Sequence, residues 1–285
     1  MNALAKSFAV AALAASVALP ASIGQTFAAT PADTLVIATT IDDIVSLDPA
    51  EIFEFSGGDL AQNVYDTLVA FEPANLSGGY VPGLAESWTI SEDGKTYSFK
   101  MRPGVKFHSG NPVTANDAAF SLQRAVILNK TPSFILTQFG FTADNVKEKI
   151  KAVDDMTLVI ETDKKYASSF VLNCLTATIG NIVDMKVAMQ NEKDGDMGYE
   201  WLKTNSAGSG AYSLRGWKPN ENYVLEANEN YWRGAPSMKR VFVRHIGESA
   251  TQRLLLEKGD VDVARNLSPD DIASISSNGD LRIDE

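Results

Sequence analysis

Short stretches in which apolar and polar side chains alternate predict strands with one buried face. In residues 96–101, Tyr97, Phe99 and Met101 alternate with threonine, serine and lysine. The turn sequence Ser-Glu-Asp-Gly separates this stretch from residues 88–90, so the pair predicts a β-hairpin. Similar patterns predict a second hairpin over 212–217 and 223–227, and further strands at 35–38, after 154–155, at 241–243, at 261–263 and within 281–285.

Apolar residues at helical spacing predict several helices between these strands. Residues 59–71 carry Leu60, Val64, Leu68 and Phe71 at three- to four-residue intervals. Thr114 is predicted to be an N-cap with Asp117 three residues later, a variant of the capping box. Further predicted helices run from 249, with the leucines 254–256 inward and Gly259 as the stop, and from the N-cap Ser268 before Pro269. Mixed strands, hairpins and helices predict an α/β fold with a mixed sheet.

The N-terminal segment differs from the rest in composition. Lys6 is its only charge, and the apolar run 8–19 leads to small residues that end at Ala28. A bilayer-spanning helix needs about 20 apolar residues, so this run is too short to span. A charged start, a short apolar run and small residues are typical of a secretory signal peptide. We therefore expect residues 1–28 to be a cleavable signal peptide and the product to be periplasmic.

Composition excludes several classes of protein. The 285 residues include 36 acidic and 25 basic side chains, giving a net charge of −11. Nucleic-acid binders carry a basic surface, so no nucleic-acid partner is expected. The single cysteine, Cys174, excludes an internal disulfide and a multi-cysteine zinc site. An apolar fraction of 45% is typical of globular proteins, and the length of the chain is compatible with about two domains.

Motifs that would indicate catalysis do not occur in the sequence. Residues 208–210, Gly-Ser-Gly, lack the spacing of a nucleophile elbow, and there is no phosphate-binding glycine loop. Residues 194–198 resemble a calcium loop weakly, but a solvated turn is favoured because a third ligand and a distal glutamate are missing. His108 is interpreted as a surface or supporting histidine, and Cys174 as a buried inert thiol. The sequence therefore predicts no enzyme, no metal site and no cofactor.

Several sequence blocks follow one another along the chain: Ser-Leu-Asp-Pro at 46–49, residues 83–110, residues 113–124, Gly-Ser-Gly-Ala-Tyr at 208–212, residues 228–236 and residues 254–263. The hairpin and capped-helix blocks, at 83–124, form a scaffold rather than a ligand site. In this order the blocks resemble the bacterial extracellular solute-binding proteins of family 5, the dipeptide, oligopeptide and nickel type binding proteins of ABC importers.

The resemblance implies a periplasmic-binding-protein-like fold of class II type, a mixed-sheet lobe with an extra hairpin and helix subdomain, that closes on its ligand by a hinge. Residues 29–263 would form the first lobe, and residues 264–285 the hinge crossover and the start of a second lobe that is mostly missing. Because family members are considerably longer, we expect a truncated gene product or a fragment. The implied partners are a short peptide and an inner-membrane ABC permease, and the protein is expected to be a monomer.

Five residues are candidates for ligand contacts in the first lobe. Phe53 and Phe55 follow the Leu-Asp-Pro block, Phe134 follows the capped helix, and Thr176 and Thr178 lie where family members approach the ligand. Aromatic rings supply apolar wall area, and threonine hydroxyls donate and accept hydrogen bonds. Ordinary core packing for the phenylalanines and ordinary strand positions for the threonines are the alternatives.

Other functions stay open at this point. The solute could be an opine, a sugar or a metal chelate rather than a peptide. A secreted hydrolase would need an activated nucleophile, which the sequence does not display, and a structural or adhesive surface module would not carry the importer-type blocks.

Overall fold

The computed structural model describes residues 31–72 and 75–284, with the side chains of 75–78 left out. Its five-stranded sheet has the order β11-β1-β10-β9-β8 and is mixed, because β1 pairs in parallel with both β10 and β11, whereas β9 runs antiparallel to β10 and β8. The sheet confirms the expected α/β class with a mixed sheet. Its strands are β1 (Thr34–Thr39), β8 (Tyr212–Lys218), β9 (Asn222–Ala227), β10 (Arg240–His245) and β11 (Val263–Ala264).

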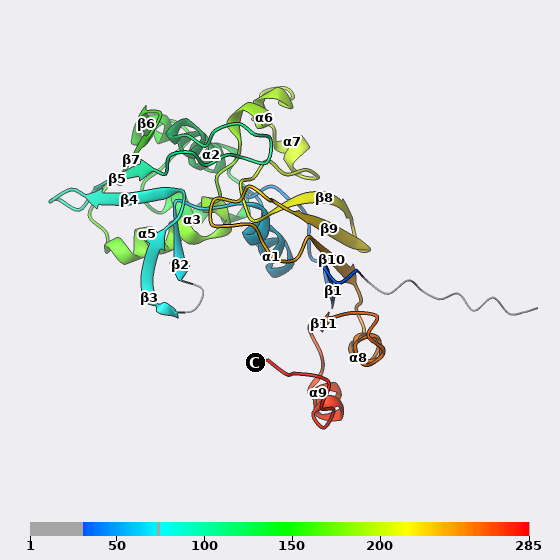
Figure 1. Cartoon of the computed structure of the whole chain (residues 1–285). Coiled ribbons are helices and arrows are strands. Elements are labelled where there is room, and N and C mark those ends of the chain that lie inside the picture. Colours follow the sequence, from blue (N-terminus) through cyan, green and yellow to red (C-terminus); the bar gives the residue numbers. More distant parts are fainter. Residues whose placement is uncertain (1–30, 73–74, 285) are drawn as a thin grey trace, which may run out of the picture. The chain divides into compact units, whose positions relative to one another are not determined.

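The core of this sheet follows from the alternation seen in the sequence. Leu225 of β9 and the pair Val241 and Val243 of β10 are buried in one cluster, together with residues of α1 (Phe55–Val64). Val36 and Ala38 of β1 are buried in another cluster, against α8 (Ser249–Lys258). In Figure 1, α1 lies beside the β8 and β9 ribbons, and α1 and β8 are in contact.

A second sheet has the order β4-β5-β7-β6 and is antiparallel throughout. The helix α2 (Ala115–Leu128) packs against β6 and β7, as Figure 1 shows. Thr114 caps α2 as predicted: its hydroxyl accepts from the Asp117 amide, and the Asp117 carboxylate accepts from the Thr114 amide at 2.9 Å. The strands are β4 (Ala85–Ile90), β5 (Thr96–Met101), β6 (Ile150–Asp154) and β7 (Thr157–Glu161).

Shorter elements connect and cover these sheets. The hairpin of β2 (Val69–Glu72) and β3 (Asn75–Pro82) packs through β2 on α5 (Ser168–Thr176). Near the C-terminal end of the described chain, α9 (Pro269–Ile275) contacts α8. The remaining elements are η1 (Thr131–Ser133), α3 (Phe134–Thr137), α4 (Val146–Lys149), η2 (Thr178–Gly180), α6 (Met185–Gln190) and α7 (Tyr199–Leu202). No helix in the described part of the chain has the length and apolar character that crossing a bilayer requires.

The structure corrects three of the predicted elements. The helix predicted at 59–71 begins earlier and ends at Val64, because Tyr65 is extended and the chain then enters β2. Leu254 is exposed rather than inward, while Leu255 and Leu256 pack toward the core. Residues 281–284 form no strand. The predicted signal peptide, residues 1–28, lies outside the described residues.

Candidate functional site

A hollow of about 280 Å³ lies where the loop before α1 meets the corner between α5 and η2. The first two turns of α1 form one wall, and the segment that joins η1 to α3 contributes a second. The hollow is lined by Ile52, Phe53, Glu54, Phe55, Gly58, Asp59, Gln62, Pro132, Ile135, Thr176, Ala177, Thr178 and Ile179.

Four of the five predicted contact residues line this hollow: Phe53, Phe55, Thr176 and Thr178. The Phe134 ring packs edge-on against Phe53, with ring centroids 5.6 Å apart. All three phenylalanines are more than half exposed, and Phe55 is 94% exposed. The core-packing alternative is therefore wrong for them, and the threonines belong to α5 and η2 rather than to strands.

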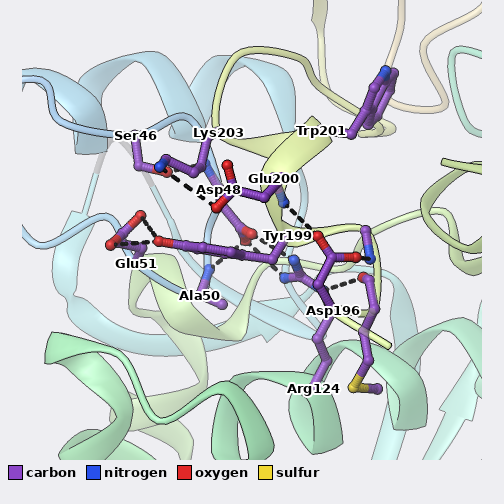
Figure 2. A network of polar contacts seen from close by, with 12 residues as sticks. Ser46, Asp48, Ala50, Glu51, Arg124, Asp196, Tyr199, Glu200, Trp201 and Lys203 are labelled. Atoms are coloured by element: carbon purple, nitrogen blue, oxygen red, sulfur yellow. Dashed lines mark hydrogen bonds and ion pairs between the residues drawn. The ribbon is translucent and has the colours of Figure 1, made fainter. Parts of the chain in front are cut away.

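A buried ion pair holds the base of the loop that carries Phe53 and Phe55. Asp48 and Arg124 are 0% and 1% exposed, and two parallel hydrogen bonds of 2.7 and 2.5 Å join the guanidinium to the carboxylate (Figure 2). The Arg124 Nε donates to the carbonyl of Met197 at 2.9 Å, so α2, the loop and the segment before α7 meet at one side chain. A bidentate pair of this kind fixes orientation as well as distance.

The same loop is held at a second point, closer to the aromatic residues. The hydroxyl of Tyr199 donates to the carboxylate of Glu51, 2.9 Å from each oxygen (Figure 2). Within the loop, the amides of Glu51 and Ile52 donate to the Asp48 carbonyl at 2.9 and 3.0 Å. The exposed rings therefore stand on a rigid base, which limits the conformational entropy lost when a ligand contacts them.

Asp196 organises the segment that supplies the Met197 carbonyl. Burial alone would raise the pKa of the Asp196 carboxyl, but amides of Lys193, Glu200 and Gly198 donate to it and Arg124 lies nearby, so its pKa is below the usual value. The segment 194–198 resembles a calcium loop in sequence, but its Asp196 carboxylate accepts hydrogen bonds from nearby main-chain amides. Figure 2 shows Asp196 beside the guanidinium of Arg124.

The groups that could support metal or nucleophilic chemistry can be located among the described residues. No three of their histidine, cysteine, aspartate or glutamate side chains come together in a way that could hold a metal ion. Burial lowers the pKa of His108, whose Nε2 lies 3.0 Å from the carbonyl of Gly210 and is therefore the protonated, donating nitrogen. Burial raises the pKa of the Cys174 thiol, as expected for an inert cysteine.

Sequence reasoning did not identify several residues of the hollow. Asp59 and Gln62 lie on the same face of α1 as Gly58, and Ile135 follows the predicted Phe134. The apolar spacing of Leu60 and Val64 predicts the helix that carries Asp59 and Gln62, but it marks the buried face and gives no signal for these two polar side chains. Asp59 is further paired with Arg265, which follows β11, and 206 positions of sequence separate the two.

The fold is that of periplasmic binding proteins. It superimposes with a TM-score of 0.74 on the ABC transporter-associated periplasmic binding protein DppA from Helicobacter pylori in complex with the peptide STSA, at 26% identity over 88% of this chain and 50% of that one. The mannopinic acid complex of MoaA from A. tumefaciens R10 gives a TM-score of 0.72 at 26% identity, covering 86% of this chain and 47% of that one.

Sequence comparison identifies the family. The model of the bacterial extracellular solute-binding proteins, family 5 Middle, matches residues 79–285, so the chain belongs to this family. The probable D,D-dipeptide-binding periplasmic protein DdpA of Escherichia coli (strain K12) is 32% identical over 260 residues, 90% of this chain and 48% of that protein. The chain thus spans about half the length of the relatives it matches.

Proposed function

We propose that the complete protein is the solute-capturing component of an ABC importer. It binds a short peptide in the periplasm and delivers it to an inner-membrane permease. The observation that carries this proposal is the hollow edged by exposed Phe53, Phe55 and Phe134 in a member of a solute-binding family. Exposed aromatic side chains on a rigid base are costly in water unless a ligand covers them.

The chemistry of the hollow suits a peptide. Aromatic rings stand beside the hydroxyls of Thr176 and Thr178 and the amide of Gln62. These groups can both donate and accept hydrogen bonds, as the backbone of a peptide requires, while the rings pack on its side chains. Two of the compared proteins are described as binding a dipeptide and a tetrapeptide, which supports the same choice.

The proposal includes the arrangement of the whole protein. Residues 29–263 would form the first lobe, residues 264–285 the hinge crossover and the start of the second lobe, and residues 1–28 a signal peptide removed on export. Family 5 membership supports a two-lobed arrangement, and the pairing of β11 with β1 places the start of the crossover at the edge of the first lobe's sheet. Closure of the two lobes about the hinge would enclose the peptide, and the protein would act as a monomer.

A thermal-shift screen on the complete gene product tests the proposed function. Di- and tripeptides should raise the melting temperature, because a ligand that binds only the native state stabilises it by about 2.7 kcal/mol at a hundredfold excess over Kd. Mannopinic acid and a nickel–histidine chelate serve as the competing solute classes. A shift with one of these and none with any peptide would overturn peptide capture.

Loss of two wall residues should weaken binding without affecting the fold. Phe55→Ala and Thr178→Ala are each expected to lower the peptide affinity more than about fivefold, or ~1 kcal/mol, at an unchanged melting temperature. The stability should persist because Phe55 is exposed. Val153→Ala is the matched control: this exposed side chain of β6 lines no part of the hollow. Equal affinities for all three variants in calorimetry would contradict the assignment.

A further inference from the structure

A second hollow adjoins the one beside the phenylalanines. It has a volume of about 440 Å³ and shares Gln62, Thr176 and Thr178 with the first, so these three side chains lie between the two hollows. Its other walls come from the end of α1, the β2 hairpin and the segment after β9. It is lined by Gln62, Tyr65, Asp66, Thr67, Ala70, Phe71, Thr176, Thr178, Asn181, Tyr231 and Arg233.

The one carboxylate in the second hollow is already engaged by the protein. Asp66 accepts hydrogen bonds from the Ser209 hydroxyl at 2.8 Å, the Tyr231 hydroxyl at 2.9 Å and the Trp232 indole at 3.2 Å. Burial and the nearby charge of Asp66 raise the pKa of Tyr231, so its hydroxyl stays protonated as the donor. Asp66 therefore serves to join three segments of chain, and most of its capacity to accept hydrogen bonds is used.

The one cation in the second hollow, Arg233, makes fewer polar contacts with the protein than Asp66 does. Arg233 donates to the carbonyl of Pro82 at 3.2 Å and lies over the ring of Trp232, 4.5 Å from its centroid. Within residues 31–72 and 75–284, no carboxylate lies within 4.0 Å of its guanidinium, whereas Arg124 and Arg265 are each ion-paired. A guanidinium carries five N–H donors in a planar fork, so most of this fork is free for a ligand.

We infer that the second hollow binds a carboxylate of the solute through Arg233. This inference rests on the proposed function and specifies the solute as an elongated, acid-bearing peptide. Its apolar side chains would contact Phe53 and Phe55, and its carboxylate would reach Arg233 past Thr176 and Thr178. A planar guanidinium matches the two oxygens of a carboxylate. Asp66 already accepts three hydrogen bonds, so it repels the carboxylate of the solute less than a carboxylate without such bonds would.

The test compares peptides that differ only in their carboxylates. Calorimetry on the complete gene product uses tri-alanine, tri-alanine amide and the amide of Ala-Ala-Glu, whose only carboxylate is on a side chain. The wild-type protein should bind at least one acid form roughly tenfold more tightly than tri-alanine amide. If tri-alanine binds more tightly than the amide of Ala-Ala-Glu, the preferred carboxylate is C-terminal; the reverse order indicates a side-chain carboxylate.

Variants of Arg233 then assign the preference to this side chain. Arg233→Gln should remove the preference, so that the acid form and tri-alanine amide bind this variant with similar affinity, and Arg233→Lys should keep part of the preference. Arg102→Gln is the matched control, because Arg102 also lies 4.5 Å from the Trp232 centroid but lines neither hollow. It should keep the full preference.

Two results would overturn the inference, and they differ from each other. If the wild-type protein binds the peptides but Arg233→Gln keeps the preference for the acid form, or no such preference exists, the carboxylate subsite is wrong and peptide capture stands. If the wild-type protein binds none of the three peptides while a competing solute class raises its melting temperature, the proposed function fails and the subsite fails with it.

Discussion

Replacing Arg124 by methionine should lower the free energy of unfolding by about 3–5 kcal/mol, because one partner of a buried ion pair is removed and the other stays charged in the core. Asp48 is fully buried and its carboxylate would lose two hydrogen bonds, of 2.7 and 2.5 Å. The carbonyl of Met197 would lose its donor as well. The measurement is the urea midpoint of the purified protein at pH 7.

An exposed ion pair of the same length provides the control. Lys149 and Glu161 lie 2.5 Å apart, but their side chains are 33% and 48% exposed. Lys149→Met should therefore cost less than about 1 kcal/mol. Adding Asp48→Asn to Arg124→Met should recover part of the lost stability, since the uncompensated charge is then gone. Equal costs for Arg124→Met and Lys149→Met would refute the prediction.

The same ion pair links stability to the proposed binding surface. Asp48 lies only five residues before Phe53, and its carbonyl holds the intervening turn. A partial loss of this anchor would let the loop move, although its aromatic side chains would be unchanged. A protein carrying Arg124→Lys, which keeps the charge but not the planar fork, separates the two roles if its peptide affinity falls more than its stability.

Local signals made several elements predictable from the sequence. The helix from Ala115 and the hairpin at 85–101 depend on residues close together in the chain: a capping box, an alternating strand and a tight turn. Phe53 and Phe55 were predictable as candidates because they follow the first predicted strand and the Leu-Asp-Pro turn. These features require no knowledge of distant contacts.

Other features depend on contacts that the sequence does not reveal. The apolar spacing of Leu60, Val64 and Leu68 continues past the end of α1, but a bridge between Thr67 and Asn181 draws the chain into an extended conformation. Leu254 lies within a run of three leucines, of which only the other two pack toward the core. Tertiary contacts override a periodic pattern in both cases.

The candidate site shows the same division. Its aromatic edge comes from two short segments, 53–55 and the start of α3, each of which follows a local signal, so sequence reasoning reached it. The pair of Asp48 with Arg124 joins residues 76 positions apart, and the second hollow combines three separate segments of chain, 62–71, 176–181 and 231–233. Arg233 carries no local signal that separates it from other arginines. Its proposed role follows only once the structure shows that Asp66 accepts three hydrogen bonds and that Arg233 lies over Trp232 in the same hollow.

Replacing Gly208 by alanine should destabilise the protein by about 3 kcal/mol, because a methyl group there meets main-chain atoms that cannot turn away. A Cβ at this position would overlap the carbonyl oxygen of Val64 and lie 2.8 Å from its carbonyl carbon and 2.9 Å from Cδ1 of Tyr65. Val64 is the last residue of α1, and Tyr65 is buried. The φ of Gly208 is not positive, so the cost arises from this close approach alone.

Two main-chain hydrogen bonds flank this close approach and join the end of α1 to the loop before β8. The amide of Gly210 donates to the carbonyl of Val64 at 2.9 Å, and the amide of His108 donates to the carbonyl of Gly208 at the same distance. Gly216→Ala in β8 is the matched control, since no heavy atom lies within 4 Å of its added Cβ, and it should change stability by less than about 0.5 kcal/mol. Circular dichroism melting curves measure both variants. Because α1 carries Phe55 and Gln62, Gly208→Ala should also weaken peptide binding. Equal melting temperatures for the two variants would show that α1 does not depend on this contact.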